Sequence, residues 1–265
     1  MLKTLGPKLA TLLFAALMGG IVAAQASDSA LHEFADTRFI APLPGSLFGV
    51  TPDGRAGFDG AMNITVPTAY TPGPGSLVVG SLNEGSNREN KLPDQFDGGN
   101  VNGSFIPGGL GMSVEGHHVF ACDMWTSKHI ESLIGLQVEL FPQTENRPSF
   151  AVGCSDLFDM RGPASNPHSA RSVYAVATME FPKAGIPTYL TLGYGNRRYQ
   201  DRPIGALSIQ PWSNIKFSAE YDGFGTNLAA AYRLWHSDAG WNAILYGQYQ
   251  KMDFPGIGFS ITRSQ

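Results

Sequence analysis

Apolar and polar residues alternate in short runs along most of the chain. In residues 214–222 every second position is apolar and the positions between are polar, with Ile215, Phe217, Ala219 and Tyr221 on one side and Lys216, Ser218, Glu220 and Asp222 on the other. Successive side chains of a β-strand point to opposite faces, so this run predicts a strand with one apolar and one polar face.

Similar runs follow one another closely from residue 133 to the end. They cover Leu133–Phe141, Ser149–Cys154, Arg171–Phe181, Thr188–Tyr194, Ile204–Gln210, Asn214–Tyr221, Thr226–Leu234, Trp241–Gln250 and Ile257–Thr262. Earlier in the chain, Ser76–Leu82 and Gly111–Ala121 are further candidates, and Phe58–Thr65 is a weaker one. Most connections are short and rich in Pro, Gly, Asp and Ser, which favours hairpins between antiparallel neighbours. The pattern therefore predicts eleven or twelve antiparallel strands.

Alternation alone fits two architectures. A soluble β-sandwich buries its apolar faces between two sheets, whereas a membrane barrel turns them to lipid and encloses the polar faces. The positions of tryptophan favour the barrel, because Trp212, Trp235 and Trp241 all lie beside turns, as in the aromatic girdles of membrane barrels. We therefore predict an all-β protein, an antiparallel up-and-down transmembrane β-barrel of about 10–12 strands.

The connections also divide between two rims. Counted back from the C-terminus, the links at 251–256, 222–225, 195–203 and 155–170 share one rim, and those at 235–240, 211–213, 182–187 and 142–148 share the other. The long 155–170 link lies opposite the C-terminus, and the three late tryptophans lie on the C-terminal rim. Long external loops and short periplasmic turns are typical of bacterial outer-membrane barrels.

The N-terminus indicates export. Lys3 and Lys8 precede an apolar stretch, and Ala24-Gln25-Ala26 forms a small-x-small cleavage site, so residues 1–26 are predicted to be a cleaved signal peptide. Residues 27–56 look like an irregular lead-in, and residues 57–265 form the predicted β-barrel domain.

Composition changes this picture little. Charged residues make up 15% of the chain, and 32 Gly, 18 Pro and 29 aromatic residues suit strands punctuated by turns. Removing residues 1–26 takes away two lysines and no acid, which moves the formal charge from −4 to −6. An acidic protein is a poor partner for nucleic acid.

The mature chain holds two cysteines, Cys122 and Cys154. In an exported protein such a pair is a candidate disulfide, and two buried thiols are an equally good interpretation. Neither residue has the spacing of a zinc site.

We find no motif for catalysis, cofactor binding or metal binding. The densest titratable group is His117-His118 with Asp123 and His129, but adjacent residues of a strand point to opposite faces, so both histidines do not readily bind one metal. Five charged residues on polar strand faces are candidates for the barrel lumen: Glu180, Lys216, Glu220, Asp222 and Arg233. Acids paired with Lys216 and Arg233 across strands are favoured over a glycosidase-type carboxylate pair.

One stretch carries a family resemblance. Residues 60–80 read GAMNITVPTAYTPGPGSLVVG, which resembles the opening signature of YjbH-type bacterial outer-membrane proteins. Ile134-Gly135-Leu136, Ala151-Val152-Gly153, Leu192–Asn196 and Ala219–Gly223 are similar too and follow in that family's order. The resemblance covers roughly residues 57–263, although the chain lacks a terminal aromatic residue and is short for the family. It implies an outer-membrane barrel linked to exopolysaccharide production or export.

The sequence thus supports a non-enzymatic outer-membrane barrel of a Gram-negative-type bacterium that needs no cofactor. Its expected partners are outer-membrane lipid and either polysaccharide or envelope export proteins. Two alternatives are a soluble periplasmic or secreted β-sandwich that binds carbohydrate, and an envelope glycoside hydrolase that uses Glu220 and Asp222.

Overall fold

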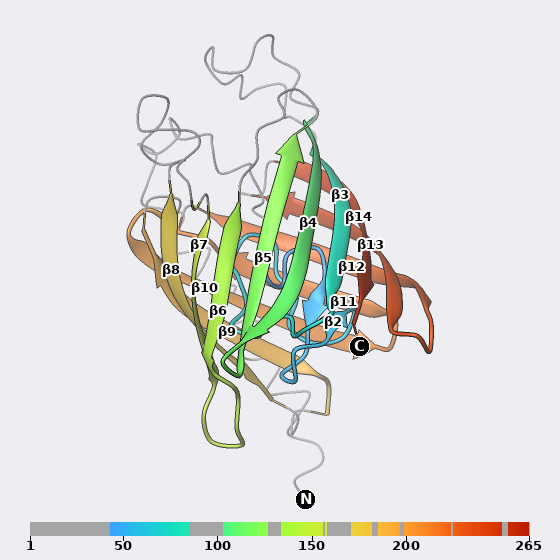
Figure 1. The fold of residues 1–265 in the computed structure, drawn as a ribbon. Coiled ribbons are helices and arrows are strands. Elements are labelled where there is room, and N and C mark those ends of the chain that lie inside the picture. Colours follow the sequence, from blue (N-terminus) through green and yellow to red (C-terminus); the bar gives the residue numbers. More distant parts are fainter. Residues whose placement is uncertain are drawn as a thin grey trace, which may run out of the picture.

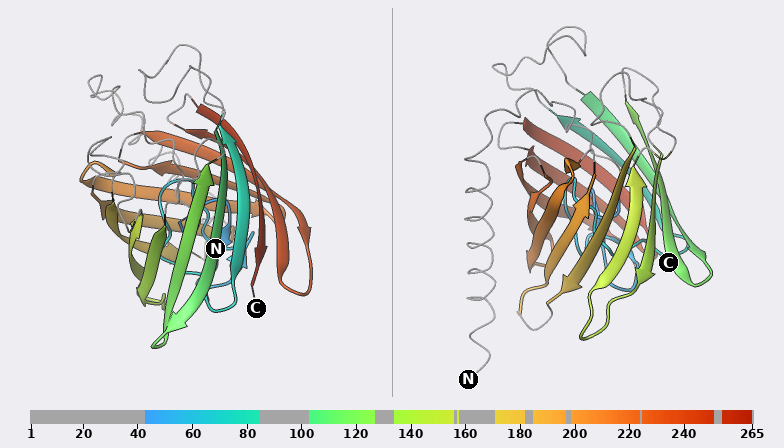
Figure 2. Two further views of the ribbon diagram at one scale, coloured as in Figure 1. Left: turned by 45° about the horizontal axis from the view of Figure 1, so that its top comes forward. Right: turned by 90° about the vertical axis from the view of Figure 1, so that its left-hand side faces the viewer.

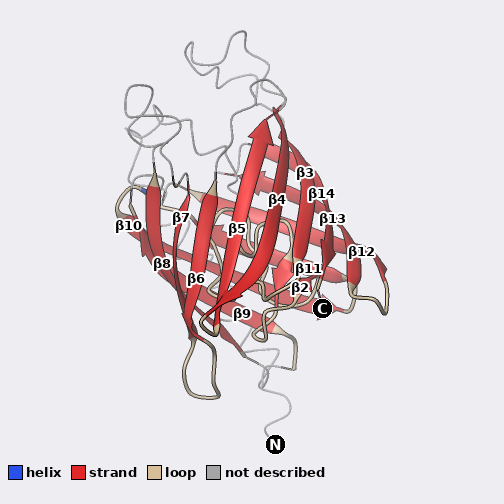
Figure 3. Ribbon diagram, viewed as in Figure 1, coloured by secondary structure: helices blue, strands red, loops and turns tan. Residues whose placement is uncertain are grey.

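The fold is a barrel that closes on itself (Figure 1). A computed structural model of the protein describes residues 43–84, 103–126, 134–155, 157, 171–181, 185–196, 199–223, 225–250 and 254–264. Within these ranges, twelve strands form one closed barrel, and two further strands form a small sheet of their own inside it. Figure 3 shows that strands make up nearly all of the described wall. No helix of the described residues is long and apolar enough to cross a membrane.

The strands are as follows. The small sheet consists of β1 (Gly49–Val50) and β2 (Ala56–Gly57). The barrel consists of β3 (Leu77–Glu84), β4 (Gly103–Val114), β5 (His117–Thr126), β6 (Gly135–Phe141), β7 (Ser149–Ser155), β8 (Ser172–Glu180), β9 (Thr188–Gly195), β10 (Arg202–Trp212), β11 (Ile215–Tyr221), β12 (Thr226–His236), β13 (Trp241–Gln250) and β14 (Phe254–Arg263).

Barrel strands pair antiparallel in sequence order. β14 closes the barrel by pairing with β3, from Arg263 opposite Leu77 to Gly256 opposite Glu84. The predicted all-β, antiparallel up-and-down barrel is confirmed, and the β-sandwich alternative is wrong because one sheet closes on itself. The predicted signal peptide, residues 1–26, lies outside the described residues.

Two predicted strands differ from the structure. The run Gly111–Ala121 is a hairpin rather than one strand, because Glu115 and Gly116 both adopt positive φ and turn the chain between β4 and β5. Two consecutive residues with positive φ match the right-handed twist of the flanking strands, which favours a two-residue turn. The weaker candidate Phe58–Thr65 forms no wall strand and lies inside the barrel.

The outer face of the wall is apolar. Alternate residues of the strands expose large apolar side chains, among them Val79 on β3, Leu110 on β4, Val173 on β8, Leu192 on β9 and Ile257 on β14. Three register shifts occur in the wall, next to Phe141, Trp212 and Trp235. A bulge re-aims side chains at a barrel rim, and all three aromatic rings are at least half exposed. The predicted positions of the tryptophans beside turns are confirmed, because Trp212 ends β10, Trp235 precedes the last residue of β12 and Trp241 begins β13.

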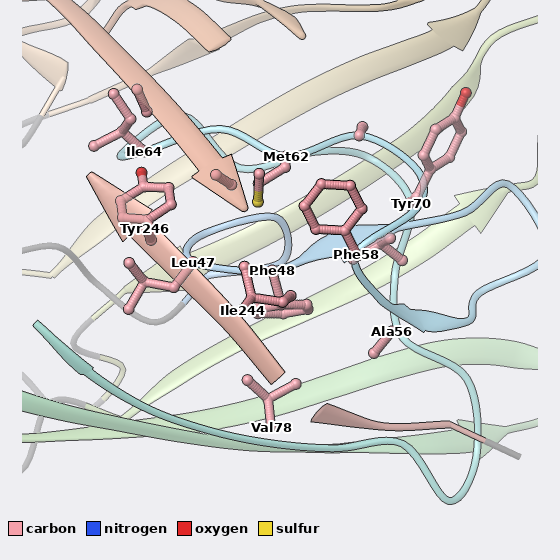
Figure 4. Close-up of a cluster of buried hydrophobic side chains, with 14 of the residues drawn as sticks. Leu47, Phe48, Ala56, Phe58, Met62, Ile64, Tyr70, Val78, Ile244 and Tyr246 are labelled. Atoms are coloured by element: carbon pink, nitrogen blue, oxygen red, sulfur yellow. The ribbon is translucent and has the colours of Figure 1, made fainter. Parts of the chain in front are cut away.

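The lumen is filled by residues 43–76, which we call the internal segment. Figure 2 shows the blue and cyan part of the chain enclosed by the wall. Within the segment, β1 pairs with β2, and Val50 and Ala61 exchange backbone hydrogen bonds. Figure 4 shows its apolar side chains packed against the wall, and the fully buried ones include Phe48, Phe58, Met62, Ile64 and Tyr70.

The need for this segment follows from the size of the barrel. Eight strands enclose a space that their own side chains can fill, whereas sixteen leave a channel. The twelve strands here turn mainly small and polar side chains inward, such as Ser149, Thr178, Ser208, Ala229 and Ser260. Side chains of this size leave room that the internal segment occupies.

The internal segment extends between the two rims. Near the C-terminal rim, a Cβ added to Gly54 would lie 2.6 Å from the ring of His118, next to the β4–β5 turn. Near the opposite rim, where β7 ends and β8 begins, the Tyr199 hydroxyl donates a hydrogen bond to the Thr65 carbonyl (3.3 Å). Tyr199 belongs to the β9–β10 link and is fully buried. The segment therefore occupies the lumen along most of the wall.

Candidate functional site

The polar contacts between the wall and the internal segment form the candidate functional site. Of the five lumen residues predicted from sequence, Lys216, Glu220 and Asp222 are buried and contact the segment or its hydrogen-bond partners. Lys216 and Glu220 belong to β11, where an alternating strand turns every second residue inward. Phe217, on the other face, is exposed.

Glu220 binds one turn of the internal segment by its backbone. Its carboxylate accepts hydrogen bonds from the amides of Ile64 (2.9 Å), Thr65 (2.8 Å) and Val66 (3.1 Å). The Thr65 hydroxyl and the Asn227 amide also donate to it, at 2.5 and 2.9 Å. Because a buried carboxylate is costly without donors, this convergence of donors explains how Glu220 can be fully buried.

Asp222 extends the same network. Its Oδ2 accepts hydrogen bonds from Asn227 Nδ2 (2.9 Å) and from the Thr65 hydroxyl (3.2 Å), and its Oδ1 accepts one from the Gly225 amide (3.0 Å). The carboxylate therefore holds both the internal segment and the β11–β12 turn. Together, Glu220, Asp222 and Asn227 surround the side chain of Thr65.

Lys216 binds a second turn of the internal segment. Its ammonium group donates hydrogen bonds to the carbonyls of Phe58 (2.5 Å) and Gly60. The ammonium also lies 5.2 Å from the ring centroid of Phe58 and 5.7 Å from that of Tyr189, within the range of cation–π attraction. Gly60 has a φ of +89°, and a Cβ there would lie 2.1 Å from the Val50 carbonyl, so this turn requires glycine.

Arg233 and Gln210 bind the residue between those carbonyls. Both donate to Asp59 Oδ1, from Arg233 Nη2 at 2.5 Å and from Gln210 Nε2 at 2.9 Å. The Arg233 guanidinium also lies 4.6 Å from the Phe58 ring centroid. Asp59 is 55% exposed, so this ion pair lies at the solvent-accessible end of the contact.

The opposite side of the wall binds residues 68–71. Gln137 Nε2 donates to the Thr68 carbonyl (2.9 Å) and to the Thr71 hydroxyl (2.8 Å). The Ala69 amide donates to Thr178 Oγ1 (2.7 Å), and its carbonyl accepts a hydrogen bond from Ser149 (3.3 Å). Wall side chains from both sides of the lumen therefore hold the internal segment.

Glu180, the fifth predicted residue, lies on β8 near a tyrosine pair. The Tyr189 hydroxyl donates to Glu180 Oε1 (3.3 Å), and the Tyr70 hydroxyl donates to Gln143 Oε1, which also accepts the Glu180 amide. Burial, reinforced by the charge of Glu180, raises the pKa of Tyr70 well above its ordinary value. Tyr70 therefore remains a neutral donor at physiological pH.

The partners of these charges differ from the sequence-based interpretation. We predicted that acids pair with Lys216 and Arg233 across strands, yet the structure gives Lys216 two backbone carbonyls and Arg233 the carboxylate of Asp59. The reason is that the internal segment lies between the strands and offers polar groups of its own. Sequence reasoning missed Thr65, Asn227 and Asp59, although Thr65 belongs to the stretch that carries the family resemblance.

Glu220 and Asp222 are the residues that the hydrolase alternative requires. In the structure both are buried and accept hydrogen bonds from the internal segment. Their observed role is to anchor the chain's own residues.

The remaining candidates do not form a site. Cys122 lies on β5 and Cys154 on β7, with β6 between these two strands, and the disulfide stays a prediction. His118 Nδ1 lies 3.4 Å from Glu139 Oε2, and His117 Nδ1 lies 3.0 Å from the Glu139 carbonyl. Among the described residues, no three His, Cys, Asp or Glu side chains are placed to bind a metal ion. His129 lies outside the described residues.

We compared the sequence with protein-family models and with curated proteins. The sequence matches no protein-family model, and it has no significant match among curated proteins.

Proposed function

We propose that the protein is a non-enzymatic outer-membrane β-barrel of a Gram-negative-type envelope, associated with exopolysaccharide production or export. Its partners are outer-membrane lipid and either polysaccharide or export proteins of the envelope. The N-terminal signal peptide provides the route of export.

One observation carries the membrane assignment. The wall exposes large apolar side chains around its outer face while charged and polar ones point inward, as Phe217 and its neighbour Lys216 illustrate. A soluble barrel would present this pattern in reverse, because large exposed apolar surfaces are rare on soluble proteins. An apolar outer face of this kind matches the hydrocarbon interior of a lipid bilayer.

The link to exopolysaccharide rests on the resemblance to the YjbH-type family. The stretch that carries it begins at Gly60, and its residues Ile64–Val66 contact Glu220. The use of Glu220 and Asp222 as anchors supports a binding or export role over hydrolysis.

Fractionation tests the location, and a deletion strain tests the role. We expect the protein in the outer-membrane fraction, resistant to a urea wash and migrating faster on gels before heating, as folded barrels do. We expect loss of the gene to lower exopolysaccharide outside the cell and the wild-type gene to restore it. A protein released by urea would contradict the membrane assignment, and unchanged exopolysaccharide would contradict the role.

Thiol labelling tests the orientation. In a C122S/C154S background, S165C lies in the predicted external link, which is outside the described residues, and S237C lies on the C-terminal rim. We expect a membrane-impermeant reagent to label S165C on intact cells and S237C only after the outer membrane is permeabilised. The opposite result would invert the topology.

A further inference from the structure

The internal segment is bound to the lumen mainly through wall side chains. Ser208 accepts a hydrogen bond from the Met62 amide (3.3 Å), Ser260 donates to the Leu47 carbonyl (2.7 Å), and Tyr246 donates to the Asn63 carbonyl (3.3 Å). The strand pairing of the segment is internal, between β1 and β2. A backbone bond from Gly111 to the Ser76 carbonyl (2.9 Å) holds the point where the segment continues into β3.

The hydrogen-bond ladder of the wall is complete without the segment. Each barrel strand pairs with two neighbours, and β14 pairs with β3. Displacement of residues 43–75 would therefore break side-chain contacts and leave the paired backbone of the wall intact. This separation is the requirement for an internal segment that can move while the barrel stays folded.

The wall behind the segment suits a saccharide. Its inward side chains carry many hydroxyls and amides, including Gln137, Ser149, Ser208, Asn242 and Thr262, together with the aromatic rings of Tyr174 and Tyr246. Hydroxyls and amides can both donate and accept hydrogen bonds, and so match the hydroxyls of a sugar. Ser218 and Thr262 have hydroxyls that are buried and unpaired among the described residues.

The largest cluster of hydrogen bonds between the described wall and the internal segment lies at Glu220. Glu220 receives three consecutive backbone amides, a hydroxyl and a side-chain amide at the end of the lumen that carries the 222–225 turn. The segment turn at Ile64–Val66 cannot leave the lumen while these hydrogen bonds persist. Hydrogen bonds to a buried carboxylate are among the strongest a protein makes.

We propose that residues 43–75 are a gate that closes a conduit for neutral saccharide chains, and that Glu220 holds this gate shut. The proposal rests on the proposed function and adds the regulation of the lumen to it. Opening moves the Ile64–Val66 turn away from Glu220 and exposes the hydroxyl and amide side chains of the wall.

Permeability of liposomes tests the gate directly. Full-length protein is reconstituted, and swelling is measured in the neutral tetrasaccharide stachyose. We expect slow swelling with the wild-type protein and swelling about tenfold faster with E220Q, because tenfold in the open fraction corresponds to about 1.4 kcal/mol of closed-state stability. T65V, which removes one hydroxyl and keeps the amide bonds, is expected to give a smaller increase.

A disulfide lock identifies the moving part. In a C122S/C154S/E220Q background, A69C/T178C joins the internal segment to β8, since the Ala69 amide lies 2.7 Å from Thr178 Oγ1. T178C/T191C is the matched control, because its disulfide joins β8 to β9 within the wall, where the two hydroxyls lie 2.9 Å apart. We expect oxidation to slow swelling only in A69C/T178C, and reduction to reverse the effect.

Each result decides the proposal. Swelling of folded E220Q and T65V at the wild-type rate would overturn it, and so would an equal effect of oxidation on both cysteine pairs. If E220Q does not fold, T65V and the locks are compared in the C122S/C154S background, where unchanged swelling overturns the gate. If the protein is absent from the outer membrane, the proposed function is wrong. If it is present and needed for exopolysaccharide but the disulfide lock has no effect on swelling, only the gate proposal is wrong.

Discussion

Two turns of the internal segment meet the same strand and are held by opposite chemistry. Lys216 and Glu220 both point inward from β11, and the first donates to the carbonyls of residues 58 and 60 while the second accepts the amides of residues 64–66. The wall therefore places a hydrogen-bond donor opposite the carbonyls of one turn and an acceptor opposite the amides of the other. A charge of the wrong sign at either position would leave those groups unpaired.

The two contacts also differ in extent and in their surroundings. Lys216 and Glu220 are both fully buried, but Glu220 accepts five hydrogen bonds beside the buried Asn227, whereas Lys216 donates two, on either side of Asp59, which is 55% exposed. Hydrogen bonds shielded from water contribute more to stability than those that water can replace. We therefore expect unequal effects of substitutions at the two turns.

The largest effect is expected at the enclosed turn. E220A should lower the free energy of unfolding by about 3–5 kcal/mol, because each buried donor left without an acceptor costs about 1–3 kcal/mol. Urea unfolding in detergent micelles measures the change, with E145A in the exposed 142–148 link as the control. An E220A protein as stable as E145A would contradict the anchoring role.

The outer face of β11 provides the next test. F217R should hinder assembly, because an arginine facing lipid near the bilayer centre costs about 2–4 kcal/mol. The fraction of heat-modifiable protein in the outer membrane measures assembly, and F217L is the control that keeps the face apolar. Equal assembly of both variants would show that Phe217 does not face lipid.

A smaller effect is expected at the second turn. K216M keeps the length of the side chain and leaves two carbonyls without a donor, but it also removes a charge that is costly to bury. We expect a loss of about 1–2 kcal/mol, near the cost of a lost hydrogen bond. Thermal unfolding followed by gel mobility measures it, and a loss equal to that of E220A would erase the difference between the turns.

The smallest effect is expected at the exposed end. D59N retains the shape of the side chain and removes the charge that faces Arg233, and exposed ion pairs contribute about 0–1 kcal/mol. We expect D59N and the wild-type protein to converge in stability as salt increases. A large loss that high salt does not reduce would show that Asp59 is more shielded than its exposure indicates.

The wall could be predicted from the sequence because alternation has a direct physical cause. In Ile215–Tyr221, Phe217 points outward and Lys216 points into the lumen. The polarity of each residue in this strand therefore indicates the face on which it lies. The hairpin at Glu115-Gly116 was missed because its sequence lacks the Asn-Gly or Asp-Gly pair that usually signals such a turn.

The candidate site could be predicted only on the wall side. Glu220 and Lys216 stand out as charges on an otherwise regular strand, but their partners depend on a segment with little periodic pattern. Residues 58–66 read as a weak strand because Phe58, Met62 and Ile64 are apolar, whereas their burial results from enclosure by the wall. Nothing in local sequence spacing indicates that a turn more than 150 positions earlier in the chain approaches Glu220.

The seam between β3 and β14 limits the routes by which the internal segment can enter the lumen. These strands are the first and last of the wall, and their pairing completes the circle. Once the seam is joined, no lateral opening remains through which bulky groups such as Phe48 and Tyr70 could enter. After the seam joins, the internal segment can reach the lumen only through an open end of the barrel, and this is also the route along which the proposed gate would move.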